Sequence, residues 1–181
     1  KFLLIAHYHQ SGIIRKDLSN LIKTSNNYFE EVILISTKLT KFEKKKLPKF
    51  IKIIIRPNYG YDFYSYKVGI NYLYRKYKKD LKNKTIVCMA SSLFYIKPKK
   101  LLEKIKKNKI KRNYFYSLTK SWEIQEHLQL DIFLFSMELF KNQLFLNWWK
   151  NIKKFKSRHI IIKKYELGLT LFLKKLQINM V

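Results

Sequence analysis

The chain has 181 residues, and its 39 basic and 12 acidic side chains give a formal net charge of +27. Hydrophobic residues make up 47%, which excludes a disordered chain, while no apolar run reaches the roughly 18 residues of a membrane span and the single cysteine excludes an internal disulfide. Only five of the basic residues are arginine, which phosphate and base recognition favour, so we assign the charge to a solvated lysine surface and expect no nucleic-acid partner.

The first part of the chain alternates short apolar runs with helical patterns. In chain order, the expected elements are a strand at Phe2–His7, a helix at Ile13–Lys23, strands at Glu31–Ser36 and Phe50–Arg56, a helix at Tyr61–Leu81, a strand at Lys84–Ala90 and a helix from Pro98 to Ile105. Nearly continuous apolar strands are typical of a parallel sheet with helices on both faces.

The pattern changes after residue 110. Two expected strands, Asn113–Leu118 and Leu128–Ser136, are followed by expected helices at Met137–Lys153 and Lys164–Leu176. No flexible linker divides the chain, so we predict a single α/β domain over residues 1–181, with a mixed, mainly parallel, Rossmann-like sheet flanked by helices. This layout resembles that of GT-A type nucleotide-sugar transferases, although layout alone never determines function. Because the sequence lacks an initiator Met, we expect it to be part of a longer protein.

The turn after the third expected strand is the strongest candidate for a ligand site. It reads RPNYGYD at residues 56–62 and lies at the carboxyl end of a strand, where open parallel sheets bind ligands. Gly60 would permit close backbone approach, Asp62 could hold a ribose hydroxyl, and Arg56 could meet a diphosphate. The alternative is that Asn58 and Gly60 only form the turn and Asp62 only caps the following helix.

Five segments occur in the order of a known family. The central one, RPNYGYDFYSYKVGI, matches the pattern R-x-N-x-G-x-D-F-x-x-x-K-x-G, and the others are AHYHQSG, VILIST, EIQEHLQLDIFLFS and YELGLTLFLKKL. Over essentially its whole length the chain thus resembles the rhamnan synthesis F family of bacterial surface-polysaccharide glycosyltransferases. The resemblance implies a GT-A-like enzyme that transfers rhamnose or a similar sugar from a nucleotide-diphosphate donor, with inversion.

The resemblance also implies roles for residues at matching positions. Glu166 would be the catalytic base that takes the proton of the acceptor hydroxyl, with Glu126 as second choice. If a helix starts at Tyr165, the favourable interaction of Glu166 with the positive end of the helix dipole would explain this residue equally well. Gly168 in the first turn of that helix favours the catalytic role, because a glycine there suggests that another group approaches closely. The expected donor-binding residues are His7, Tyr8, Ser36, Arg56, Asn58, Gly60, Asp62, Ser91 and Ser92.

One departure from the family concerns the metal. Where the family has an Asn-Asp-Ser type triplet, this chain has Ala90-Ser91-Ser92, without a carboxylate for Mg²⁺ or Mn²⁺. We therefore assign no metal ligand and leave the need for a divalent cation open. Lys97, Lys99, Lys100 or Arg56 could replace the charge of the cation. Alternatively, the domain has lost catalysis and only binds, as a module of a larger glycan synthase.

The expected acceptor-binding residues are Trp122, His127 and Gln129. Strand alternation predicts that His127, Gln129 and Asp131 share one face. A purely local hydrogen bond would explain His127 equally well. Trp122 lies outside any periodic run and could stack on a sugar, whereas the other two tryptophans are expected in the core.

The implied partners are a nucleotide sugar, a glycan or lipid-linked glycan acceptor, and other domains of a longer chain. The first apolar run, Phe2–Ala6, is too short for a signal peptide, so we expect a cytoplasmic protein. The excess of lysine would also allow peripheral association with the cytoplasmic face of the inner membrane.

Overall fold

The computed structural model describes residues 1–108, 110–123, 125–155 and 157–181. Across these ranges a seven-stranded sheet runs in the order β3-β2-β1-β4-β6-β5-β7. Strands β1 to β4 are parallel, β6 runs antiparallel to β4 and to β5, and β7 is parallel to β5. The strands are β1 (Phe2–His7), β2 (Glu31–Ser36), β3 (Lys52–Ile55), β4 (Thr85–Ala90), β5 (Tyr114–Ser121), β6 (His127–Ser136) and β7 (Asn179–Met180). The predicted α/β class with a mixed, mainly parallel sheet is confirmed.

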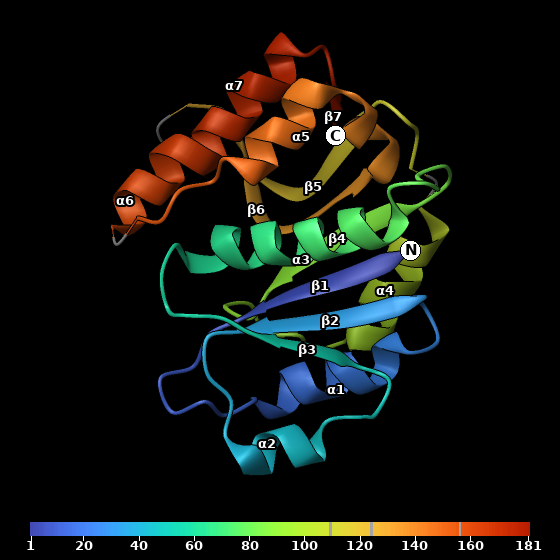
Figure 1. Cartoon of the computed structure of the whole chain (residues 1–181), viewed down its shortest axis with the longest axis vertical. Helices are drawn as coiled ribbons and strands as arrows, with labels where there is room; N and C mark the ends of the chain where they lie inside the picture. The colour runs from blue at the N-terminus through green and yellow to red at the C-terminus, as the bar shows by residue number, and fades with distance from the viewer. Residues whose placement is uncertain (109, 124, 156) are drawn as a thin grey trace.

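Helices cover both faces of the sheet (Figure 1). In β1, Phe2 and Leu4 pack on one side and Leu3 and Ile5 on the other, all fully buried, which explains why the strand is apolar throughout. The first face carries α3 (Tyr61–Tyr77), α5 (Gln143–Lys150), α6 (Arg158–Ile161) and α7 (Gly168–Lys175), and the second carries α1 (Lys16–Ser25) and α4 (Pro98–Lys107).

Two glycines fix the position of α3. A Cβ at Gly69 would lie 2.8 Å from a methyl group of Leu4, so the helix packs directly on β1. Gly60 has φ +71°, a left-handed conformation that favours glycine, and a Cβ there would lie 2.7 Å from the Cβ of Tyr64. Together they place the first turn of α3 at the carboxyl ends of the parallel strands. In Figure 1 this turn and α6 lie on the side opposite the N-terminus.

Some elements differ from the sequence-based expectations. The helix expected at Met137–Lys153 is broken, because Asn142 is extended and its side chain accepts from the N–H groups of Leu144 and Phe145, which starts α5. Before it lies a short 3-10 helix, Met137–Lys141. The helix α2 (Lys41–Lys46) and strand β7 were not expected. The sequence of α2, KFEKKK, has no apolar periodicity that would predict a helix. The helix is started by the Thr40 side chain, which accepts the Glu43 N–H.

Within the described ranges, no helix combines the length and the apolar character needed to cross a membrane.

Candidate functional site

A cavity of about 540 Å³ opens at the carboxyl ends of β1, β3 and β4. Strand β6 pairs with β4 only as far as Met89 opposite Ile132, so the first residues of β6 extend past β4 and contribute to the wall. The residues that line the cavity include Glu166 and, among the expected donor-binding residues, Tyr8, Arg56, Asn58, Gly60, Asp62, Ser91 and Ser92. The structure therefore brings the turn after β3, the end of β4 and Glu166 together.

Arg56 holds the turn after β3. Its buried guanidinium donates to the Ser65 hydroxyl at 2.9 Å and to the carbonyls of Pro57, Tyr59 and Tyr61 at 2.8, 2.6 and 2.5 Å. Four of its five N–H groups are thus used within the turn. These bonds give Arg56 a positioning role at the start of α3, and they leave little of its guanidinium for the expected contact with a diphosphate.

His7 and Ser36 join the ends of β1 and β2. The Nδ1 atom of His7 lies 2.8 Å from the Ser36 hydroxyl, and its Nε2 atom lies 3.2 Å from the Ile13 carbonyl. Burial lowers the pKa of His7 to about 4, so the ring is neutral near pH 7. Neither residue lines the cavity, and both polar groups are used inside the protein. This arrangement gives no support to their expected role in donor binding.

The end of β4 is held by an arginine. The Arg15 guanidinium donates to the carbonyls of Ser91 at 2.7 Å and Leu93 at 2.5 Å, and pairs with both carboxylate oxygens of Asp17 at 3.0 Å. The Ser91 hydroxyl accepts the Tyr8 backbone N–H at 3.1 Å. The oxygen atoms of Ser91 thus already have donors, and this position does not suit a divalent cation, which favours carboxylates.

The rest of the site offers no group of metal ligands among the described residues. Among the described residues, no three His, Cys, Asp or Glu side chains are placed to hold a metal ion together. The lysines at 97, 99 and 100, which were expected to replace a cation, do not line the cavity. The cations that do line it, besides Arg56, are Arg15 and Arg158.

Three carboxyl groups, those of Asp62, Asp131 and Glu166, face the same cavity. Burial raises the pKa of each, and proximity to Asp131 raises the pKa of Asp62 and Glu166 further. The positive charge of Arg158 lowers the pKa of all three groups, but by less than these effects raise it. The site therefore contains carboxyl groups that hold a proton more tightly than exposed ones, as general acid–base catalysis requires.

The ionised form of Asp62 should lower the stability of the fold at neutral pH. Its pKa is raised from 3.8 to about 6, first by burial, so the native state binds the proton more tightly than the unfolded chain. The stabilisation that this proton gives is complete below about pH 4 and is lost as the pH rises through about 6. We expect Asp62→Asn to raise the free energy of unfolding by about 2 kcal/mol at about pH 8, and the gain to fall away at about pH 4.

Urea unfolding at the two pH values measures this effect. Asp80 is the matched control, because its exposed carboxylate pairs with Lys84 at 2.6 Å. Asp80→Asn should give no gain at either pH. An Asp62→Asn variant that is no more stable than the wild type at about pH 8 would show that the buried charge carries no cost.

Glu166 lies in the middle of a helical stretch. The stretch begins at Arg158, and residues Ile162–Leu167 form a π-helical segment between α6 and α7. The expected helix start at Tyr165 is therefore wrong, and a helix dipole does not explain Glu166. Within the described residues a Cβ at Gly168 would meet only the Lys163 carbonyl, at 3.7 Å, so no protein group approaches it closely.

The π-helical segment is fixed to the start of β6. The Thr170 hydroxyl donates to the Glu166 carbonyl at 3.1 Å and accepts the Leu128 N–H at 3.1 Å. The Nδ1 atom of His127 lies 2.8 Å from the Gln125 carbonyl, and its Nε2 atom lies 3.8 Å from a Glu166 carboxylate oxygen. These contacts hold the Glu166 side chain, which is 25% exposed, at the cavity wall.

The expected acceptor-binding residues do not line the cavity. His127 is buried behind Glu166, while Trp122 is 68% exposed beyond the end of β5. The pairing of β6 with β5 shifts between Ser117 and Thr119, so side chains do not alternate regularly along β6. Of His127, Gln129 and Asp131, which were expected on one face, Asp131 alone lines the cavity. Glu126, the second choice of base, is exposed and pairs with Lys120 at 3.2 Å. The other two tryptophans pack in or against the core, as expected.

Sequence reasoning missed the roles of Arg15, Asp131 and Arg158. Arg15 precedes α1 and Arg158 begins α6, and no local motif marks either residue. Asp131 was noted only as a member of an alternating strand. Arginine is scarce in this sequence, and three of its five arginines line the cavity. The positions of the arginines could therefore have indicated Arg15 and Arg158.

The sheet order and the position of the cavity place this chain among α/β domains with a Rossmann-like sheet. The family model for rhamnan synthesis protein F matches residues 32–178, and the chain belongs to this family. A curated relative, the uncharacterized protein y4gN of Sinorhizobium fredii (strain NBRC 101917 / NGR234), is 25% identical over 167 residues. That match covers 90% of this chain but 43% of the relative, so the chain spans less than half of the relative's length. The family connects the chain with polysaccharide synthesis.

Proposed function

We propose that the domain transfers a sugar, rhamnose or a similar one, from a nucleotide-diphosphate donor to a bacterial surface-polysaccharide acceptor, with inversion at the sugar. The observation that carries the proposal is Glu166, a carboxylate of raised pKa held in a cavity at the carboxyl ends of parallel strands. Membership of the rhamnan synthesis protein F family supports the kind of product.

The donor would lie between the turn after β3 and the end of β4. Tyr8 is 54% exposed at the cavity and offers a ring for base stacking, while Asn58 and Ser92 offer exposed polar groups. The Arg158 guanidinium forms no hydrogen bond or ion pair with any other described residue, and it is therefore available to a diphosphate. Arg15 would add positive potential from the opposite side, reduced by its pairing with Asp17.

The transfer step needs a base and a stabilised leaving group. The Glu166 carboxylate would take the proton of the acceptor hydroxyl while that oxygen forms its bond to the anomeric carbon. At the same time the bond from the anomeric carbon to the diphosphate breaks, and Arg158 would stabilise the negative charge that the diphosphate retains. His127, 3.8 Å behind Glu166, would orient the carboxylate without touching the substrate.

The alternative proposal is a degenerate, non-catalytic module that binds glycan or a partner enzyme. The observation that favours it is Ala90-Ser91-Ser92, which offers no carboxylate to a metal and in which Tyr8 and Arg15 engage the hydroxyl and the carbonyl of Ser91. A binding module needs no base, so it predicts that Glu166 can be replaced without loss of function.

Isothermal titration with nucleoside diphosphates and their sugars, with and without Mn²⁺, tests the proposal. We expect binding under both conditions, weakened about tenfold or more in Arg158→Gln by loss of a charge-assisted contact. Arg75→Gln, which removes an exposed arginine outside this cavity, is the matched control and should bind as the wild type does. Absence of nucleotide binding under both conditions would favour the non-catalytic module.

A further inference from the structure

The loop between β4 and α4 carries two apolar side chains that point to solvent. Phe94 is 72% exposed and Ile96 is 85% exposed. Phe94 and Ile96 flank Tyr95, whose ring is buried. The loop thus presents Phe94 and Ile96 outward and anchors Tyr95 inward.

Hydrogen bonds fix this arrangement. Tyr95 donates its hydroxyl to the Ala90 carbonyl at 2.5 Å and its backbone N–H to Asp17 at 3.0 Å. Arg15 donates to the carbonyls of Ser91 and Leu93 and lies 4.3 Å from the centre of the Phe94 ring. Because the backbone is held on both sides of Phe94, the exposure of Phe94 and Ile96 is built into the fold.

Basic residues lie next to the two exposed side chains in the chain, and Arg15 contacts Phe94. Lys97, Lys99 and Lys100 follow directly and are exposed, and residues 91–102 contain no Asp or Glu. Apolar side chains flanked by lysines are typical of segments that insert into the interface of an anionic bilayer, where the lysines meet lipid phosphates.

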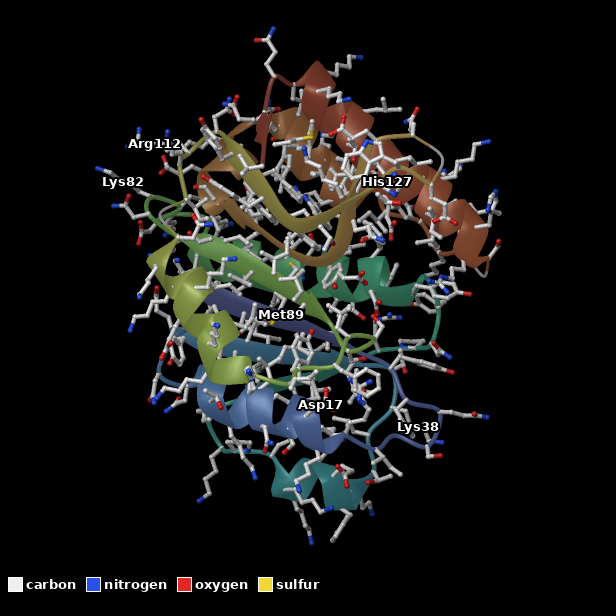
Figure 2. All side chains as sticks on the ribbon, turned by 180° about the vertical axis from the view of Figure 1, so that it is seen from behind. Asp17, Lys38, Lys82, Met89, Arg112 and His127 are labelled. Atoms are coloured by element: carbon white, nitrogen blue, oxygen red, sulfur yellow. The ribbon has the colours of Figure 1, made fainter. Side chains whose placement is uncertain are left out.

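The loop lies on the same edge of the sheet as the mouth of the cavity. Tyr8 and Ile13, which follow β1, and Trp122, which follows β5, are also exposed at this edge. Figure 2 shows His127 and Lys38 on this side of the molecule and Lys82 and Arg112 on the other. A flat surface that contacts the loop would therefore lie close to the cavity opening.

We propose that the loop of residues 92–97, with Lys99 and Lys100, docks the domain on an anionic phospholipid surface and turns the cavity toward it. Phe94 and Ile96 would enter the interface while the three lysines bind headgroup phosphates. Only the purpose of the docking, which is to bring the cavity to a lipid-linked acceptor, rests on the proposed function. The docking itself requires no nucleotide.

Sedimentation with vesicles of phosphatidylglycerol and phosphatidylcholine in equal parts tests the docking, with pure phosphatidylcholine as the neutral comparison. The wild-type protein should bind the anionic vesicles, and increasing salt should release it. The double variant Phe94→Gln with Ile96→Gln should bind at least about tenfold more weakly. The matched control replaces Leu144 and Leu171, exposed on α5 and α7, by Gln and should bind within about twofold of the wild type.

The lysines are tested in the same way. Replacing Lys97, Lys99 and Lys100 together by Gln should weaken binding at least about tenfold, since each lysine near the surface contributes to the attraction. The control replaces Lys104, Lys106 and Lys107 at the other end of α4, beside Lys1, and should lose much less.

Three results would overturn the docking proposal: no binding of the wild type to anionic vesicles, equal binding of the loop variants, or an equal loss in the controls. Nucleotide titration of the same variants separates this proposal from the proposed function. Loop variants that keep nucleotide binding and lose vesicle binding support docking, whereas vesicle binding without any nucleotide binding would refute only the donor site.

Discussion

Glu166→Gln is expected to lower the rate of sugar transfer by about 10²- to 10⁴-fold, the usual contribution of a general base, without weakening donor binding. Gln keeps the size and hydrogen-bonding shape of Glu but cannot take a proton. Since burial and Asp131 raise the pKa of Glu166, the wild-type rate should fall as the pH drops, starting nearer neutrality than an exposed glutamate would allow. Turnover with a nucleotide sugar and a glycan acceptor measures the rate, and titration measures binding.

Glu126→Gln is the matched control for this experiment. Glu126 is exposed and contacts Lys120 across the end of the β5–β6 pair, outside the cavity. Its replacement should leave the rate within about twofold of the wild type. Unchanged turnover in Glu166→Gln would remove the assigned base and favour a domain that binds without catalysis.

Arg56→Met is expected to lower the free energy of unfolding by about 3 kcal/mol, because three backbone carbonyls and a buried hydroxyl lose a charged donor at once. The turn after β3 would lose its fixed shape, so donor binding should weaken as well. Urea unfolding measures the stability. Arg75→Met, at an exposed position of α3, should change it by less than about 0.5 kcal/mol. A loss below about 1 kcal/mol in Arg56→Met would contradict the positioning role.

The sequence predicts the sheet well because its central strands are buried on both faces. The expected bounds Phe2–His7 and Glu31–Ser36 are those of β1 and β2, since an uninterrupted apolar run leaves little choice of register. Elements stabilised by something other than apolar periodicity were missed. The helix α2 depends on a cap at Thr40, and the two-residue β7 depends on pairing with β5.

The candidate site was predictable where one segment forms it. The turn at residues 56–62 carries its own signal, and it lies at the cavity as expected. The partners of that turn are remote in sequence: Arg158 and Asp131 reach the cavity through the helical stretch after α5 and through a strand whose alternation is broken. No local pattern shows such a convergence. The same holds for His7 and Ser36, whose mutual hydrogen bond only the sheet pairing reveals.

The proposed donor site is tested most directly by a crystal structure of the protein soaked with a nucleoside diphosphate. We expect the nucleotide in the cavity of about 540 Å³, with its base near Tyr8 and its diphosphate in contact with Arg158, and with Glu166 open to the position where an acceptor would attack. A nucleotide bound elsewhere on the surface, or an empty cavity at saturating nucleotide, would contradict the proposed donor site.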